Sequence, residues 1–392
     1  MAIRQLPFEY AVRNLGRSRS RLAASLLGST LVVLLVLASG GFVRGMQRTL
    51  VQADTLHENV ILLGTGSEEA LERSQIDAAV AGIAGASIPG IRQVGGVAFV
   101  SPEINIALPV RAEPDGEALN AVLRGVRPVA LLVHPEVEIV EGRPPRAGEE
   151  ELMVGGLAAT RLGLPDERLA IGETLHFDGR DWTIVGRFRA PNTVMDAELW
   201  LPIIDLQVAT RREATISSVV VSLAEGGRFA DVDLFAKSRL DLELSAVRER
   251  DYYASLAAFY APIRAMVIVT AVLIASGGIL GGLNTTYAAF AARVREVGML
   301  QALGYTRRAV VLSLGEESVL VAAAGAILGV GLGLLLLDGL AVRFSMGAFA
   351  LTLDAPVVLA GLAGGLTVGV VGAIPPAVRC LRLPVAEALK AH

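Results

Sequence analysis

The residues that could carry catalytic or metal chemistry are few and scattered. The histidines do not recur at the short, regular spacings that metal ligands need, and a single cysteine excludes intrachain disulfides and cysteine-rich zinc sites. These residues are His57, His134, His176, His392 and Cys380. We therefore expect structural or surface roles for the histidines and no metal bound by this chain.

Two carboxylates, Asp196 and Glu198, lie close enough in sequence to suggest a glycosidase pair. Their neighbours, including Trp200, instead favour the beginning of a β-strand in a packed domain. The sequence also lacks the Gly-x-x-x-x-Gly-Lys-[Ser/Thr] loop that cradles nucleotide phosphates. We predict a non-catalytic chain that binds no cofactor of its own.

Three polar residues fall inside long apolar stretches, where polar groups are costly and often functional. Asn284 is predicted to form hydrogen bonds between helices, with substrate binding as the alternative. Glu316 and Glu317 are predicted to pair with arginines at the membrane flank, with a proton or substrate site as the alternative.

The elements that would position these residues are membrane helices. Hydrophobic residues make up 53% of the chain and charged residues only 19%, which is apolar for a soluble protein. A membrane span needs about 20 apolar residues. Four stretches qualify: residues 22–43, 263–292, 309–337 and 355–378. With 35 basic and 39 acidic residues there is no basic excess, so we expect no nucleic-acid partner.

Arginine placement predicts the orientation, because cytoplasmic flanks carry the excess of Lys and Arg. Such an excess occurs in residues 1–21, 293–308 and 379–392. The short outer loop at 338–354 has only Arg343 against two aspartates. We therefore expect a multi-pass protein of the cytoplasmic (inner) membrane with both termini in the cytoplasm. Residues 1–21 are predicted to form an amphipathic surface helix, or else a tail that only sets topology.

The predicted fold class is membrane α-helical, with four transmembrane helices and an inserted α+β extracytoplasmic domain at residues 44–262. Strands are expected at 59–63 and 217–223, each followed by a helix, the first beginning after Ser74. Asp178-Gly179 predicts a hairpin turn in a β-rich middle section. A stalk helix is expected at about 248–262.

A family resemblance enters at residues 293–303, which read Arg-Val-Arg-Glu-Val-Gly-Met-Leu-Gln-Ala-Leu before Gly304. This segment resembles the cytoplasmic loop motif of MacB/FtsX-type ABC transporter permeases. Leu383-Pro384-Val385-Ala386-Glu387 resembles that family's ending, and Trp182-Thr183-Ile184-Val185-Gly186 resembles its periplasmic core. The resemblance extends over nearly the whole chain.

The resemblance implies a type VII ABC permease whose ATPase is a separate subunit, which would bind the ATP and Mg. It implies a MacB-like periplasmic core with a discontinuous porter-like part at about 45–95 and 212–247, enclosing an inserted part at about 96–211. The expected partners are an ABC ATPase, a second permease copy or paralogue forming a dimer, and membrane lipid. A periplasmic adaptor and an outer-membrane channel are further candidates.

Residues 293–308 are predicted to form the cytoplasmic coupling helix that receives force from the ATPase, with a solvated basic loop as the alternative. Apolar residues recur at helical spacing and would seat in a groove of the ATPase, with charged residues at its rim. The apolar set is Val294, Val297 and Leu300 or Leu303. The rim is Arg293, Arg295 and Glu296, and the glycines of the motif are Gly298 and Gly304.

Three functions fit unequally. The leading hypothesis is ATP-driven export or extraction of a drug, peptide, lipid or lipoprotein. The alternative is an FtsX-like mechanotransmitter that activates an extracytoplasmic partner, such as a cell-wall hydrolase, without transport. A membrane-anchored adhesion or receptor module leaves the cytoplasmic motif unexplained.

Overall fold

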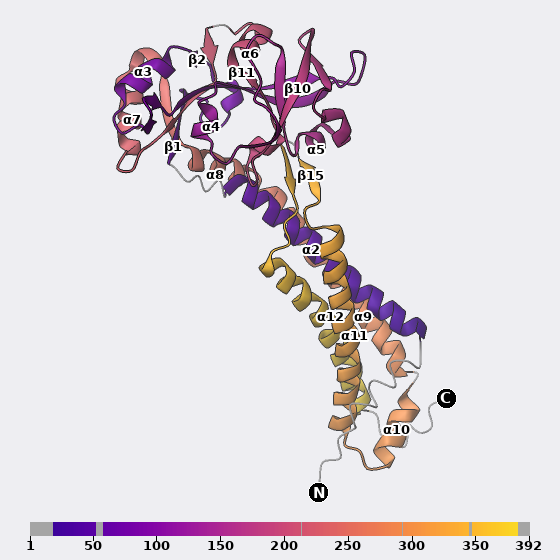
Figure 1. The fold of residues 1–392 in the computed structure, drawn as a ribbon. Helices are drawn as coiled ribbons and strands as arrows, with labels where there is room; N and C mark the ends of the chain where they lie inside the picture. The colour runs from indigo at the N-terminus through magenta and orange to yellow at the C-terminus, as the bar shows by residue number, and fades with distance from the viewer. Residues whose placement is uncertain (1–18, 52–57, 213, 292, 345–346, 383–392) are drawn as a thin grey trace. The chain divides into compact units, whose positions relative to one another are not determined.

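The computed structural model describes residues 19–51, 58–212, 214–291, 293–344 and 347–382. The chain divides into two compact units (Figure 1). The helical unit comprises residues 1–44, 262–340 and 351–392, and the sheet unit comprises residues 45–261 and 341–350. The amphipathic helix predicted for 1–21 and most of the tail predicted for 379–392 lie outside the described residues.

The helical unit is built from long apolar helices. Their bounds are α2 (Arg19–Val51), α9 (Ala261–Ala291), α10 (Val294–Ala302), α11 (Arg307–Leu336) and α12 (Ala355–Arg382), and the end of α2 belongs to the sheet unit. Four of them are long and apolar enough to cross a membrane, at residues 22–49, 261–284, 307–336 and 355–375. Together with the α+β sheet unit, this confirms the predicted fold class.

Small residues make the closest helix contacts in this unit. A Cβ on Gly329 would lie 2.8 Å from Cβ of Val33, and one on Gly369 would lie 2.3 Å from Cβ of Ala322. The Ser29 hydroxyl donates to the Ala322 carbonyl across 3.1 Å. Lipid tails are as apolar as leucine, so helix association in a membrane depends on this close fit and on interhelical hydrogen bonds.

The sheet unit is organised around one ten-stranded mixed sheet with strand order β14-β1-β13-β5-β6-β11-β8-β10-β7, and β9 pairs with β10. Its strands are β1 (Asn59–Gly64), β5 (Val100–Val110), β6 (Leu119–Val126), β7 (Glu138–Gly142), β8 (Glu151–Gly155), β9 (Thr174–Phe177), β10 (Arg180–Arg189), β11 (Leu199–Pro202), β13 (Ser218–Ser222) and β14 (Leu244–Arg248). Pairs β6–β11 and β8–β10 are parallel, and the other pairs are antiparallel.

Short elements complete the sheet unit. The two-stranded pairs join β2 (Ile76–Asp77) to β12 (Thr215–Ile216), β3 (Gln93–Val94) to β4 (Val97–Ala98), and β15 (Ala341–Phe344) to β16 (Gly347–Ala350). The α-helices are α3 (Val80–Ser87), α4 (Ala130–Val133), α5 (Ala158–Leu162), α6 (Ile203–Thr210), α7 (Phe229–Ser238) and α8 (Glu249–Phe259). The 3₁₀ turns are η1 (Leu71–Arg73), η2 (Asp166–Leu169), η3 (Val194–Ala197) and η4 (Leu240–Leu242).

Two local expectations need correction. The helix expected directly after Ser74 begins only at Val80, because Ile76 and Asp77 first pair with β12 as strand β2. The outer loop at 338–354 also contains more structure than its length suggested. Its strands β15 and β16 form a hairpin that packs against α5 and η3, and Phe349 is 2% exposed. A connection between two membrane helices therefore belongs to the core of the sheet unit.

The predicted porter-like and inserted parts share one sheet. Strand β5 pairs with β13, from the porter-like part, and with β6, from the insert. A continuous apolar core also extends from Val60 on β1 to Trp182 on β10. These two parts are joined by backbone hydrogen bonds, although their boundaries as separate parts stay a prediction.

Candidate functional site

Helix α10 lies between α9 and α11 and is held against α11 by its own apolar face. Val297 is 6% exposed and packs with Val310 and Leu314, with Leu300 and Tyr305 at the edge of this cluster. Gly304, with a φ of +92°, ends the helix in a conformation that other residues rarely adopt. The Thr306 hydroxyl then caps α11 by accepting from the Ala309 amide at 3.2 Å.

The exposed face of α10 differs from the predicted docking face. Arg295 is exposed, Met299 is 54% exposed and Leu303 is 63% exposed. These three residues are spaced four apart and form one stripe along the helix. The prediction that Val297 seats in an ATPase groove is wrong, because that side chain is buried on its own chain. Helical spacing identified an apolar face but could not tell whether the chain itself covers it.

Most other residues of the predicted coupling segment lie on or near this helix. Gly298 is buried, Val294, Glu296 and Leu300 are half-buried, and Gly304 is exposed. Arg293 does not lie on a free rim, which corrects a second prediction. Its Nη1 donates to Oε2 of Glu317 across 2.9 Å, and each of the two side chains is 12% exposed.

The Arg293–Glu317 pair separates the two neighbouring carboxylates. Glu317 is paired and half-buried on α11, whereas Glu316 is exposed on the same helix. Asn284 is exposed on α9, so the structure places it apart from the packed helix contacts. A buried arginine–carboxylate pair is costly to break, because removing one partner leaves an uncompensated charge.

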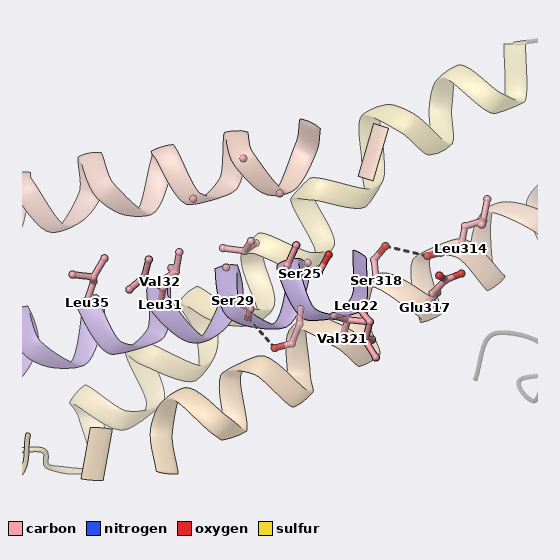
Figure 2. Close-up of a pocket in the computed structure, with 18 of the residues that line it drawn as sticks. Leu22, Ser25, Ser29, Leu31, Val32, Leu35, Leu314, Glu317, Ser318 and Val321 are labelled. Carbon is pink, nitrogen blue, oxygen red and sulfur yellow. Dashed lines mark hydrogen bonds between the residues drawn. The ribbon is translucent and has the colours of Figure 1, made fainter. Parts of the chain in front are cut away.

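The pair stands at one end of an apolar groove within the helical unit. The groove has a volume of about 440 Å³ and is lined by α2, α9, α11 and α12. Figure 2 shows Leu22, Ser25 and Ser29 along α2, with Glu317 and Ser318 of α11 at one end. The two serines on different helices bond to backbone carbonyls, Ser29 to Ala322 and Ser318 to Leu314. The groove thus offers an apolar wall with its charged groups confined to one end.

The sheet unit contains a second group of interacting charges, which we call the buried ionic cluster: Glu103, Arg124, His134, Glu198 and Glu249. Arg124 holds both oxygens of Glu198 at 2.7 and 2.8 Å through Nε and Nη2, and its Nη1 lies 2.5 Å from Oε2 of Glu103. His134 Nε2 lies 2.8 Å from the other Glu103 oxygen, Oε1. All five side chains are buried.

The cluster also joins the two chain segments that enter and leave the sheet unit beside α2 and α9. The Asn59 amide, at the start of β1, donates to Oε2 of Glu249, the first residue of α8, across 2.8 Å. The same amide donates to the Val133 carbonyl at 3.1 Å. Oε1 of Glu249 lies 3.8 Å from Nδ1 of His134. This arrangement fixes the two segments to each other and to the centre of the sheet.

Mutual pairing dominates the acid–base behaviour of the cluster. Burial alone would raise the pKa of Glu103, but His134 and Arg124 outweigh it and bring that pKa down to about 2. Burial alone would lower the pKa of His134, but Glu103 outweighs it and raises that pKa to about 10. Burial raises the pKa of Glu249, against the opposing effect of His134. At neutral pH, Glu103 and His134 form an ion pair.

Sequence reasoning missed this cluster, although it considered two of its members. His134 was assigned a default structural role, and Glu198 was interpreted only as the approach to a strand. The missed signal is a charged residue within an otherwise apolar strand, as with Glu103 in β5 and Arg124 in β6. Within the residues described, no group of three His, Cys, Asp or Glu side chains is arranged to hold a metal ion.

Comparison with known proteins identifies the family. Residues 22–233 match the MacB-like periplasmic core domain, and residues 268–385 match the FtsX-like permease C-terminal region. A search of curated proteins finds no match.

Solved structures with a similar fold are domains of such proteins. The periplasmic region of MacB from Actinobacillus actinomycetemcomitans has a TM-score of 0.38 at 11% identity, covering 51% of this chain and 92% of that one. The extracellular domain of the noncanonic ABC-type transporter YknZ from Gram-positive bacteria has a TM-score of 0.37 at 14% identity, covering 48% and 99%. A domain of a putative permease from Porphyromonas gingivalis has a TM-score of 0.33 at 16% identity, covering 49% and 86%.

The family match does not depend on those distant structural likenesses. The periplasmic core alone matches more than half of the chain, and the permease region matches the helices that follow it. The four apolar helices and the mixed-sheet unit agree with both matches. This chain belongs to the MacB/FtsX family of ABC transporter permeases.

Proposed function

We propose that this chain is the non-catalytic permease subunit of an ATP-driven transporter, moved by a separate ABC ATPase that docks on α10. The ATPase would bind the ATP and Mg and carry out the hydrolysis. The observation that carries the proposal is the exposed stripe of Arg295, Met299 and Leu303 on a helix otherwise packed against its own chain. Exposed apolar side chains on a short helix, beside a charge, suit insertion into a groove of a partner protein.

The packing of α10 supports transmission of force. Because Val297 packs with Val310 and Leu314 of α11, a push on the exposed stripe would move α11 together with α10. The pair between Arg293 and Glu317 adds a second connection between the same two elements. The coupling helix would therefore act as a rigid lever on the spans, with no chemistry of its own.

Two covalent routes lead from the spans to the sheet unit. Helix α9 follows α8 after a single turn residue, Tyr260, and the β15–β16 hairpin connects α11 to α12 from within the sheet unit. Movements of the spans would reach the sheet unit along both routes and drive export or extraction. The cargo we propose is a drug, peptide, lipid or lipoprotein, handed to an adaptor and an outer-membrane channel where these exist.

The docking proposal is tested by co-purifying the chain with its ABC ATPase from membranes. The double variant Met299→Asp and Leu303→Asp should lower ATPase recovery by about tenfold or more, because charges would replace the apolar contact centre. Its thermal stability should match the wild type, since both side chains are exposed.

Two further variants make this experiment specific. The apolar exchange Met299→Leu and Leu303→Met keeps the hydrophobic contact and should retain the ATPase. Val297→Asp should instead reduce the chain's own stability, because it places a charge in the packed cluster with Val310. Full ATPase recovery with the double aspartate variant would refute docking on this face.

A second permease copy is proposed to cover α9. None of the membrane-spanning window of α9 is buried within this chain, and Leu280 is 65% exposed. Leu280→Cys in a Cys380→Ser background should form a disulfide between copies in native membranes. Leu335→Cys on α11, 78% exposed, is the matched control for a residue facing lipid. Equal crosslinking at both positions would contradict a specific contact through α9.

A further inference from the structure

A small cavity lies inside the sheet unit, and all its lining residues belong to that unit. Its volume is about 80 Å³. The wall comprises Tyr252 and Tyr253 of α8, Tyr260 just beyond α8, Phe349 of the β15–β16 hairpin, and aliphatic side chains such as Leu71. The four aromatic residues are each no more than 6% exposed. An apolar wall with a few convergent polar groups is the usual composition of a small-molecule site.

One polar group in this wall lacks a partner. Asn105 is 4% exposed and lines the cavity, and its Nδ2 is buried without a hydrogen-bond partner among the described residues. A buried amide donor left unsatisfied costs free energy, so native structures normally provide an acceptor. A ligand oxygen in the cavity would supply that acceptor.

An acid and a base also line the cavity. Glu72 is half-buried and Arg161 is 7% exposed, and each is subject to the charge of the other. Burial raises the pKa of Glu72, and burial lowers the pKa of Arg161, in spite of their mutual attraction. Neither charge is fully compensated by the protein. A ligand that carried both signs would stabilise both charges.

The remaining charges of the wall are already committed. Arg124 and Glu198 also line the cavity, but they bind each other through two hydrogen bonds. Tyr252 accepts the Leu71 amide hydrogen at its hydroxyl, 3.3 Å away. The polar chemistry available to a ligand is thus one carboxylate, one guanidinium and one amide donor.

We propose that this cavity binds a small zwitterion with an apolar body, of the size and chemistry of an aliphatic amino acid. Its carboxylate would accept from Asn105 and Arg161, its ammonium group would face Glu72, and its side chain would contact the aromatic wall. At 10 to 15 Å³ for each water-sized group, the cavity holds about five to eight non-hydrogen atoms. Valine, with a four-carbon backbone and branch beyond its carboxylate, is of this size.

The test is equilibrium binding to the full-length chain in lipid nanodiscs, with L-valine as the probe. Two analogues of the same shape each lack one charged group: 3-methylbutanoate lacks the ammonium and isobutylamine lacks the carboxylate. Valine should bind saturably and about tenfold or more tightly than either analogue, because only valine satisfies both charges.

Single variants assign each charge to its residue. Glu72→Gln should weaken valine about tenfold while leaving 3-methylbutanoate within about twofold, because only valine carries the ammonium. Asn105→Leu should weaken valine and 3-methylbutanoate but not isobutylamine. Glu69→Gln, an exposed carboxylate three residues from Glu72 that does not line the cavity, is the matched control and should change nothing. Unchanged melting temperatures confirm that each variant is folded.

Three results would overturn the proposal. They are the absence of saturable valine binding up to about 10 mM, equal binding of all three probes, and wild-type affinity in Glu72→Gln. Water alone in the cavity would produce the first of these. The measurement includes no ATPase, so its failure would leave the docking of an ATPase on α10 unaffected.

Discussion

The helical unit and the sheet unit are both rich in apolar residues but are packed on different principles. The sheet unit buries its largest side chains completely, including Trp182 and Trp200, and pairs charges inside its core. The helical unit leaves Leu335 78% exposed and places glycine at its tightest contacts, as at Gly329 beside Val33. Burial from water stabilises the first unit, while shape complementarity holds the second together, because lipid removes the hydrophobic gain.

The largest expected effect breaks the buried ionic cluster. Arg124→Met should destabilise the sheet unit by about 3–5 kcal/mol, because Glu103 and Glu198 would remain buried without their cation. Arg127→Met, an exposed arginine three residues away, is the control and should stay within about 0.5 kcal/mol. Chemical denaturation with a tryptophan fluorescence readout measures both. Equal stabilities would mean that the cluster contributes nothing net.

A smaller effect should appear as a dependence of stability on pH. The pKa of His134 is raised from 6.5 to about 10, so its stabilising charge is fully present below pH 6.5 and is lost as the pH rises toward 10. We expect a loss of about 1.5–3 kcal/mol, the contribution of a hydrogen bond to a charged group. The unfolding free energy, measured from pH 6 to 10 in wild type and His134→Gln, should decline more steeply in wild type. Parallel curves would contradict the ion pair.

The helical unit should respond to size at positions where the sheet unit responds to charge. Gly329→Leu should cost about 1–3 kcal/mol, because its first added carbon would already meet Val33. Gly331→Leu, on the same helix with open space around it, adds the same group without a clash. Thermal unfolding in detergent compares the two. If Gly331→Leu were equally destabilising, helix propensity or detergent effects would explain the loss better than packing.

The smallest effect sharpens the contrast between lipid and water. Leu335→Ala should change stability by less than about 0.5 kcal/mol, because the side chain is exposed in the helical unit. Leu123→Ala, in the centre of the sheet unit, should cost about 2–5 kcal/mol. The same substitution thus separates the two kinds of surface. Similar losses at both positions would show that α11 is covered by protein in the assembled transporter.

Some features followed from the sequence because they depend on composition over a window. The four spans required only apolar length, and the matching helices begin and end within a few residues of the predicted bounds. The hairpin at Asp178-Gly179 required only a turn signal between two strand patterns, and β9 and β10 flank it. The family followed from short motifs and is confirmed by the two matched regions.

Other features required knowledge of which residues meet. Register places Asn105 opposite Arg124, and so brings Glu103 within reach of that arginine although 21 residues separate them. The helical pattern of α10 predicted an apolar face at Val297, but only the packing on Val310 shows that the chain covers this face itself.

The sequence by itself determined that this chain spans a membrane, carries a mixed α+β domain and contains a helix suited to a partner. Those properties follow from local hydrophobicity, turn chemistry and motif. Tertiary structure alone decided that Met299 and Leu303 remain available for docking, that Glu317 pairs with Arg293, and that His134 is a buried cation. The reason is physical: the ionisation and exposure of a side chain depend on neighbours that only the folded chain brings within a few ångströms.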